Sequence, residues 1–182
     1  MARTALDEES LEKAAIDYLG HYASSAGNLR RVLMRRIARA GAEREAAAAA
    51  REAIEAVVAR LRAKNLLDDR LYAAQLAQSL RRRGGSATSI RARLAEKGVA
   101  EDDAKAALAG LGAAAASELA AACVLVRRRR LGPYRAVASR AAFRERDLGV
   151  LARAGFGLDL ARRVLAARDE SELERLAQEE DA

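Results

Sequence analysis

The side chains that most often carry catalysis are scarce in this chain. It contains one histidine, His21, and one cysteine, Cys123. This count excludes an internal disulfide and argues against a zinc site or a Ser–His–Asp set. Asp68 and Asp69 are adjacent carboxylates, but consecutive helical residues point about 100° apart and cannot act on one substrate. They fit a helix N-cap better, so we predict no catalytic residue, no metal and no cofactor.

The chemistry that the sequence does offer is anion binding by arginine. Arg31, Arg35 and Arg39 follow one another at i, i+4 and i+8, opposite the apolar face of their predicted helix. No Asp or Glu occurs between positions 18 and 42, so nothing nearby offsets a repulsion of about 0.2–0.5 kcal/mol per like-charged pair. We predict that this row binds an anionic partner, and the alternative is a solvated face.

Two further basic clusters occur later in the chain, and for these the binding and solvated interpretations stay equally open. They are Arg81, Arg82 and Arg83 with Arg91 and Arg93, and Arg127, Arg128, Arg129 and Arg130 with Arg135. The predicted partner-binding residues are Arg31, Arg35, Arg39, Arg81, Arg82, Arg83, Arg91, Arg127, Arg128, Arg129 and Arg130.

The charge distribution supports an anionic partner. The 182 residues carry a net charge of +7. Seven acids against one arginine give residues 169–182 a net charge of −6, which leaves +13 on residues 1–168. A body this basic is typical of proteins that bind nucleic acid or a nucleoprotein. No apolar run approaches twenty residues and the N-terminus is polar, so we expect a soluble cytoplasmic protein without a signal peptide or membrane span.

The sequence predicts an all-α protein that carries these arginines. Apolar residues recur at helical spacing, and capping residues and glycines separate one predicted helix from the next. We predict helices at about residues 11–22, 25–41 and 43–64, a second set between Asp68 and Leu111, and a third between Ala115 and Leu165, with 134–142 open between loop and helix. In the second set Asp68 and Ser86 are predicted N-caps, and Leu71, Tyr72, Leu76 and Leu80 recur at helical spacing. In the long alanine-rich helix Arg51 is expected to pair with Glu55, and the acidic tail is expected to continue as a solvated helix with Leu173 and Leu176.

An internal repeat organises these helices. Leu94, Gly98, Val99, Ala104 and Leu108 align at one fixed offset with Leu151, Gly155, Phe156, Ala161 and Leu165. Each glycine of the repeat is predicted to be the left-handed residue that ends a middle helix. We predict three tandem three-helix modules in an elongated, curved molecule, at residues 1–67, 68–112 and 113–168, followed by an acidic tail at 169–182.

Taken together, these residues resemble the RecX family, the regulators of the bacterial RecA recombinase. The resemblance extends from about Ala14 to Leu165. It rests on the order and spacing of Tyr18-Leu19 with Ser24, Leu29-Arg30 and Leu33; Leu67-Asp68-Asp69-Arg70 with Tyr72-Ala73; Lys97-Gly98-Val99; and Leu151-Ala152-Arg153-Ala154-Gly155-Phe156. The chain departs from the family pattern in its alanine-rich insertion, in Gly132-Pro133-Tyr134-Arg135, and in Gly20-His21, where a basic residue is usual.

The resemblance implies a non-enzymatic monomer of tandem three-helix repeats that binds along the groove of the RecA–DNA filament. It implies inhibition of RecA's ATPase, strand-exchange and co-protease activities, and therefore a role in recombination, DNA repair and the SOS response. Weak contact with single-stranded or duplex DNA, without sequence specificity, is also expected. The alternative is a direct DNA-binding helical regulator, although no predicted helix presents a clear set of base-reading side chains.

Overall fold

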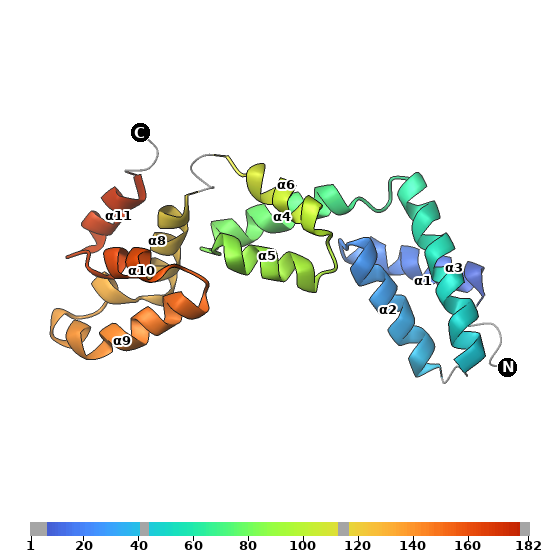
Figure 1. Cartoon of the computed structure of the whole chain (residues 1–182), viewed down its shortest axis with the longest axis horizontal. Coiled ribbons are helices and arrows are strands. Elements are labelled where there is room, and N and C mark those ends of the chain that lie inside the picture. Colours follow the sequence, from blue (N-terminus) through green and yellow to red (C-terminus); the bar gives the residue numbers. More distant parts are fainter. Residues whose placement is uncertain (1–6, 41–43, 113–116, 179–182) are drawn as a thin grey trace. The chain divides into compact units, whose positions relative to one another are not determined.

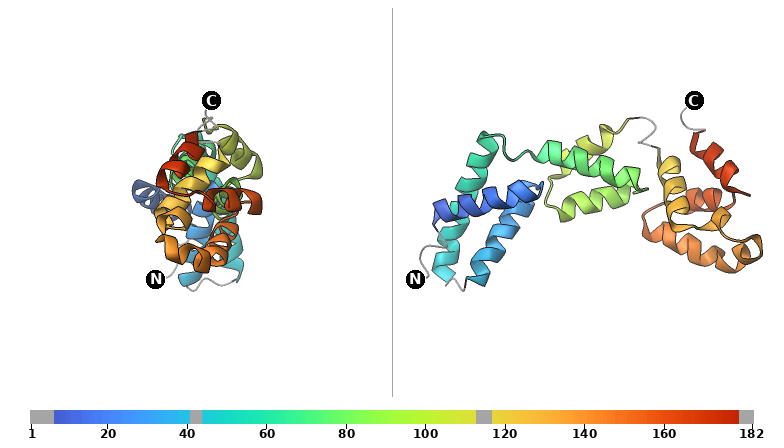
Figure 2. Two further views of the ribbon diagram at one scale, coloured as in Figure 1. Left: turned by 90° about the vertical axis from the view of Figure 1, so that its left-hand side faces the viewer. Right: turned by 180° about the vertical axis from the view of Figure 1, so that it is seen from behind.

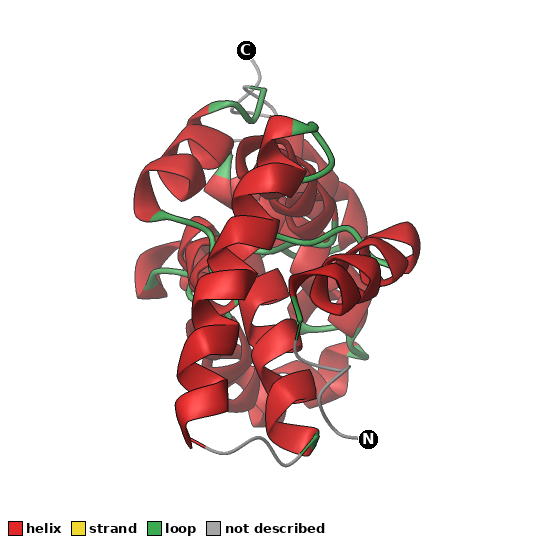
Figure 3. Ribbon diagram, turned by 90° about the vertical axis from the view of Figure 1, so that its right-hand side faces the viewer, coloured by secondary structure: helices red, strands yellow, loops and turns green. Residues whose placement is uncertain are grey.

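The structure is a computed structural model that describes residues 7–40, 44–112 and 117–178. Within these ranges the chain is helical, with no strand and no cis peptide bond (Figure 3). This confirms the predicted all-α fold. The elements, labelled in Figure 1, are α1 (Glu8–His21), α2 (Ala26–Arg39), α3 (Arg44–Ala63), α4 (Asp69–Arg82), α5 (Ala87–Glu96), α6 (Glu101–Ala109), α8 (Glu118–Arg129), the 3-10 turn η2 (Gly132–Tyr134), α9 (Val137–Arg153), α10 (Leu158–Leu165) and α11 (Glu170–Gln178).

Side-chain caps begin several of these helices. The carboxylate of Asp68 accepts a hydrogen bond from Leu71 N at 2.9 Å, and Ser86 Oγ accepts from Ser89 N at 3.0 Å. Both satisfy an amide that has no partner inside its own helix. Gly98 and Gly155 have φ of 73° and 84°, in the left-handed region that favours glycine. The predicted caps and the predicted left-handed glycines are therefore confirmed.

The chain forms two compact units. We call residues 1–73 with 95–103 the N-terminal unit, and residues 74–94 with 104–182 the C-terminal unit. The boundary passes through α4, α5 and α6, so each of these helices contributes to both units. The division into three modules is not decided by this boundary and stays a prediction.

The core of the N-terminal unit lies among the first three helices. Helix α3 packs against both α1 and α2, which lie beside it in the views of Figures 1 and 2. Of the predicted apolar stripe of α2, Leu29, Leu33 and Ile37 are buried and Val32 is half-buried. The apolar residues of the C-terminal half of α3 pack in the same core. The buried residues are Leu11, Ala15, Ala26, Leu29, Leu33, Ile37, Ala50, Ile54, Val57, Val58, Leu61 and Leu67. The large apolar side chains with which α3 packs in this core therefore lie in its C-terminal half, between Ile54 and Leu61, and Ala50 is a smaller contact before them.

The core of the C-terminal unit includes the acidic C-terminal helix. Helix α11 packs on α8, and Leu173 is 2% exposed in the same apolar cluster as Leu119, Val126 and Leu151. Leu176 packs partly buried against this cluster. The expectation of a solvated helix is therefore wrong. The helix forms, but burial of its apolar side chains is more favourable in free energy than their exposure to water.

The apolar residues of α4 differ in how deeply they are buried. Leu71 is 56% exposed, whereas Ala73 and Ala77 occupy buried positions of α4. Tyr72, Leu76 and Leu80 are half-buried beside these alanines, so only Leu71 of the four residues at helical spacing lies outside the buried face. Helix α8 ends at Arg129, and the ambiguous stretch after Pro133 resolves into η2 and the first turns of α9.

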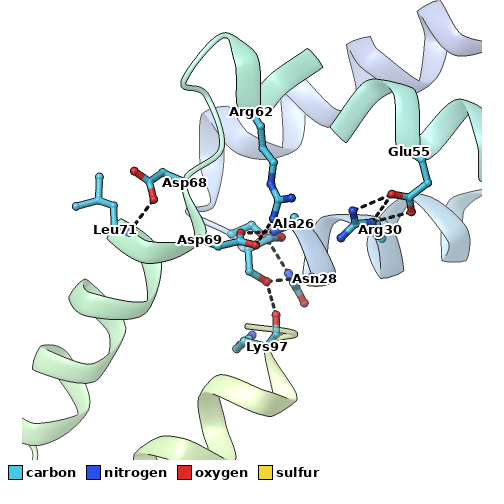
Figure 4. A network of polar contacts seen from close by, with 11 residues as sticks. Ala26, Asn28, Arg30, Glu55, Arg62, Asp68, Asp69, Leu71 and Lys97 are labelled. Atoms are coloured by element: carbon cyan, nitrogen blue, oxygen red, sulfur yellow. Dashed lines mark hydrogen bonds and ion pairs between the residues drawn. The ribbon is translucent and has the colours of Figure 1, made fainter. Parts of the chain in front are cut away.

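A serine at the start of α2 ties together three segments of the N-terminal unit. Ser25 Oγ caps α2 and also donates to the backbone oxygen of Lys97. The first amide of the helix, Ala26 N, donates to Asp69 Oδ1 at 2.6 Å, and Asp69 Oδ2 accepts from Arg62 Nη2 at 2.6 Å (Figure 4). We call this arrangement a serine joint.

A second serine joint occurs in the C-terminal unit. Ser86 Oγ caps α5 and donates to Ala154 O at 2.6 Å. The first amide of α5, Ala87 N, donates to Glu118 Oε1 at 2.7 Å, and the same carboxylate pairs with Arg81 at 2.7 Å. In both joints the carbonyl that accepts from serine precedes a left-handed glycine. The sequence repeat thus extends to contacts between distant segments.

Asp147 fixes the turn after α8 from inside the C-terminal unit. It is 1% exposed and accepts from Gly132 N at 3.0 Å and from Nε and Nη2 of Arg135 at 2.7 Å each. Burial alone would raise the pKa of Asp147, but the hydrogen bonds from Arg135 and Gly132 outweigh it and hold the pKa below its usual value. The guanidinium of Arg135 also lies 4.4 Å above the ring of Phe143.

A lowered carboxyl pKa stabilises the fold above the unfolded pKa of about 4, and this stabilisation is lost as the pH falls through the folded value. We expect Asp147→Asn to lower the free energy of unfolding at neutral pH. The gap to the natural protein should narrow in acid, where Asp147 is itself protonated. Urea unfolding at several pH values measures this. If the difference in unfolding free energy between the variant and the natural protein does not change with pH, the role assigned to the ionised carboxylate of Asp147 is contradicted.

Candidate functional site

A groove of about 650 Å³ opens between α1 and α2 of the N-terminal unit. Its lining combines three kinds of side chain: apolar residues of both helices, aromatic residues of α1 and of its C-cap position, and arginines of α2. The lining residues are Ala14, Asp17, Tyr18, His21, Tyr22, Val32, Leu33, Arg35, Arg36 and Arg39. We call this site the basic groove. It includes two of the three arginines of the predicted row.

The arginines of the basic groove have no charge partner among the described residues. Arg35, Arg36 and Arg39 are all exposed, and no described residue accepts a hydrogen bond or forms an ion pair with them. Because positions 35, 36 and 39 lie on adjoining turns of one helix face, their charges repel one another. Asp17 is the one acid among the described residues that line the groove. The groove is thus suited to an anion that accepts from several guanidinium groups.

Tyr18 of α1 and Tyr22, the C-cap residue of this helix, form the opposite wall. The rings of Tyr18 and Tyr22 have centroids 5.3 Å apart, and Tyr22 is 61% exposed. Tyr18 is held in place because its hydroxyl accepts from Asn28 Nδ2 at 3.1 Å. An exposed ring beside a fixed ring offers a face on which a flat group can stack, with guanidinium groups within the same groove.

Arg31, the first member of the predicted row, does not line the basic groove. Its Nη2 donates to the backbone oxygen of Glu96 at 2.5 Å. The neighbouring Arg30 forms a two-pronged ion pair with Glu55, with Nε and Nη2 both 2.7 Å from carboxylate oxygens. This pair corrects the expected Arg51–Glu55 contact. The pKa of Glu55 is lowered by its hydrogen bonds with Arg30.

The other predicted arginines have different surroundings. Arg81 is only 5% exposed and pairs with Glu118, so it belongs to the second serine joint rather than to a surface. Arg82 and Arg91 are exposed on α4 and α5, and Arg130 is exposed at the left-handed end of α8. Arg127 lines a small hollow with the buried Cys123. Arg83, Arg128 and Arg129 line one pocket together.

Sequence reasoning missed Arg36 and the role of Tyr22. Arg36 lies beside the predicted row of every fourth residue, but the groove follows positions 32, 35, 36 and 39, which is the full width of one helix face. A signal was present, because two tyrosines four residues apart precede an acid-free basic helix.

The described residues contain neither a candidate metal site nor a candidate membrane-spanning helix. Their His, Cys, Asp and Glu side chains form no group of three that could hold a metal ion. No described helix combines the length and the apolar character needed to cross a bilayer.

Comparison with known proteins gives a consistent result. The domain family described as "RecX, second three-helix domain" matches residues 68–108. Regulatory protein RecX of Myxococcus xanthus (strain DK1622) is 41% identical over 160 residues, which is 85% of this chain and 83% of that protein. Regulatory protein RecX of Agrobacterium fabrum is 34% identical over 104 residues, covering 57% of this chain and 54% of its own length.

Solved structures resemble the fold as well. A crystal structure of regulatory protein RecX has a TM-score of 0.57 at 20% identity and covers 87% of this chain and 70% of its own. RecX from Lactobacillus salivarius also has a TM-score of 0.57, at 15% identity, and covers 96% of each chain. At these identities the structural likeness concerns the fold alone.

Proposed function

The chain belongs to the RecX family of regulatory proteins, and we propose that it regulates the RecA recombinase by binding the RecA–DNA filament through the basic groove. The observation that carries this proposal is the set of three exposed groove arginines without a described charge partner. A helix that repels itself in the free protein gains stability when an anionic partner occupies the groove.

The chemistry of the groove suits a filament of protein and nucleic acid. Guanidinium groups bind phosphates and carboxylates by paired hydrogen bonds, so both DNA and an acidic protein surface are partners for Arg35 and Arg39. Tyr22 adds a stacking face for an unpaired base. Each such contact is weak alone, but contacts made by several parts of one chain act at high effective concentration.

The proposal includes the consequences of that binding. The protein inhibits RecA's ATPase, strand exchange and co-protease activities by occupying the filament, without a reaction of its own. It acts as a monomer in the cytoplasm, where RecA and its DNA substrates meet. It thereby limits recombination, DNA repair and the SOS response.

The direct test is RecA's ATP hydrolysis on single-stranded DNA, with and without this protein. We expect the rate to fall at less than one copy of this protein per RecA, because one bound regulator affects neighbouring subunits of a filament. Strand exchange measured in parallel should fall with it. Unchanged rates at a one-to-one ratio would contradict regulation of RecA.

The second candidate is a regulator that binds DNA directly, and the combination of tyrosines with arginines in the groove favours it. The same preparations separate the two candidates. Binding to a duplex in the absence of RecA, with a preference for one sequence, would identify a direct DNA-binding regulator. Binding that depends on RecA supports the first proposal.

A further inference from the structure

Two basic clusters that are far apart in the sequence meet in the C-terminal unit. The turn between α4 and α5 contains Gly84, which is buried and has a φ of 81°. A Cβ atom at this position would lie 2.7 Å from Leu125 N and 2.9 Å from Ala121 O, both in α8. Glycine therefore lets the backbone of the turn lie directly against the backbone of α8.

This close approach places three arginines around one pocket. Arg128 Nη1 donates to the backbone oxygen of Arg83 at 2.8 Å, which links the two clusters. Arg83, Arg128 and Arg129 line a pocket of about 290 Å³, which we call the triple-arginine pocket. The remaining lining residues are Leu80, Gly84, Gly85, Ser89, Leu125 and Ala154.

No described lining residue neutralises the positive charges of the triple-arginine pocket. No carboxylate is among the described residues that line it. Arg83 is oriented by two hydrogen bonds to Ser79, from Nε to the backbone oxygen and from Nη2 to Oγ, each 3.1 Å long. Arg129 is exposed and bonds to no described residue. Three guanidinium groups around one hollow repel one another, and a bound anion would offset that repulsion.

We propose that the triple-arginine pocket binds a phosphate group of a nucleic-acid backbone. A phosphate offers several acceptor oxygens to guanidinium groups that approach from different sides. Leu80 and Leu125 supply an apolar wall for the adjoining sugar. Arg82 and Arg130 are exposed and follow or precede lining arginines in the sequence, next to Arg83 and Arg129, so they add positive charge near the pocket. This site is separate from the basic groove and does not depend on regulation of RecA.

The test uses the full chain without RecA and a fluorescent oligothymidylate. Arg128→Gln combined with Arg129→Gln removes two of the three guanidinium groups. We expect the dissociation constant to rise at least tenfold. The slope of log K against log salt should fall by about 0.7, the value for one phosphate contact on a single strand. Fluorescence anisotropy at several salt concentrations measures both quantities.

A matched control separates the pocket from net charge. Arg144→Gln combined with Arg175→Gln removes the same charge from exposed positions of the same unit, outside the pocket. We expect this pair to change the dissociation constant less than twofold. Equal weakening by both pairs would overturn the proposal. If the first pair lowers the melting temperature, Arg129→Gln alone replaces it, since Arg129 bonds to no described residue.

Two further measurements identify the source of the phosphate. On an oligonucleotide with a neutral methylphosphonate backbone, the difference between the natural protein and the pocket variant should disappear. Inorganic phosphate, followed by 31P NMR, should compete with the oligonucleotide only weakly. Saturation by inorganic phosphate together with an unchanged oligonucleotide affinity in the variant would assign the pocket to free phosphate and overturn the nucleic-acid assignment.

Discussion

Reversing Arg35 and Arg39 to Glu is expected to weaken binding to the RecA filament tenfold or more, which is about 1.4 kcal/mol at the least. Both side chains line the basic groove, and the change replaces two positive charges with two negative ones. The half-inhibiting concentration in the RecA ATPase assay should rise accordingly. Its dependence on salt should flatten, because fewer cations are exchanged on binding. Melting temperature and helix content should stay nearly constant, since both residues are exposed.

The control changes the same amount of charge in the same unit. Lys13→Glu with Arg51→Glu alters two exposed positions, on α1 and α3, that do not line the groove. We expect this variant to inhibit RecA nearly as well as the natural protein. If the groove variant also inhibits normally, the basic groove is a solvated face and the filament contact lies elsewhere.

Arg31 is left out of this test for a structural reason. Its hydrogen bond to Glu96 O would be lost in any reversal, so a weaker inhibitor would not report on binding alone. The sequence placed Arg31 with Arg35 and Arg39 because the three share one helix row. Their separation depends on residue 96, far along the chain, and no local pattern contains that information.

Local features of the fold were predictable because their causes are local. An N-cap needs one side chain within three residues of the amide that it satisfies, and the predictions for Asp68 and Ser86 were confirmed. A left-handed glycine at the end of a helix depends on its own φ, and Gly98 and Gly155 were identified correctly. The all-α fold followed from many such signals acting together.

The features that escaped prediction depend on distant contacts. Whether Arg81 is a binding residue or an internal link depends on Glu118, 37 positions away. The burial of Leu173 depends on the surface that α8 offers to α11. The triple-arginine pocket joins Arg83 to Arg128 across 45 positions. The sequence shows where these charged residues lie along the chain. Only the packing of the helices decides which of their side chains come into contact.

The serine joint gives the largest expected effect on stability. Gly98 follows the carbonyl that accepts from Ser25, and a Cβ at Gly98 would lie 2.9 Å from the Cα of Gly27. Gly98→Val combines a strained left-handed φ with a collision against backbone that cannot rotate away. We expect it to lower the free energy of unfolding by about 3 kcal/mol or more. Denaturant unfolding followed by circular dichroism measures this.

Two companion variants separate strain from collision. Gly98→Asn tolerates the left-handed conformation but still carries a Cβ, so it should cost nearly as much as Val if the approach of Gly27 is the main constraint. Gly20→Val, in α1 of the same unit, has no atom within 4 Å of the new Cβ and should be close to neutral. A near-neutral Gly98→Asn would mean that the two backbones separate at little cost. The joint would then fix the end of α5 through hydrogen bonds alone, and Ser25→Ala would be the more damaging change.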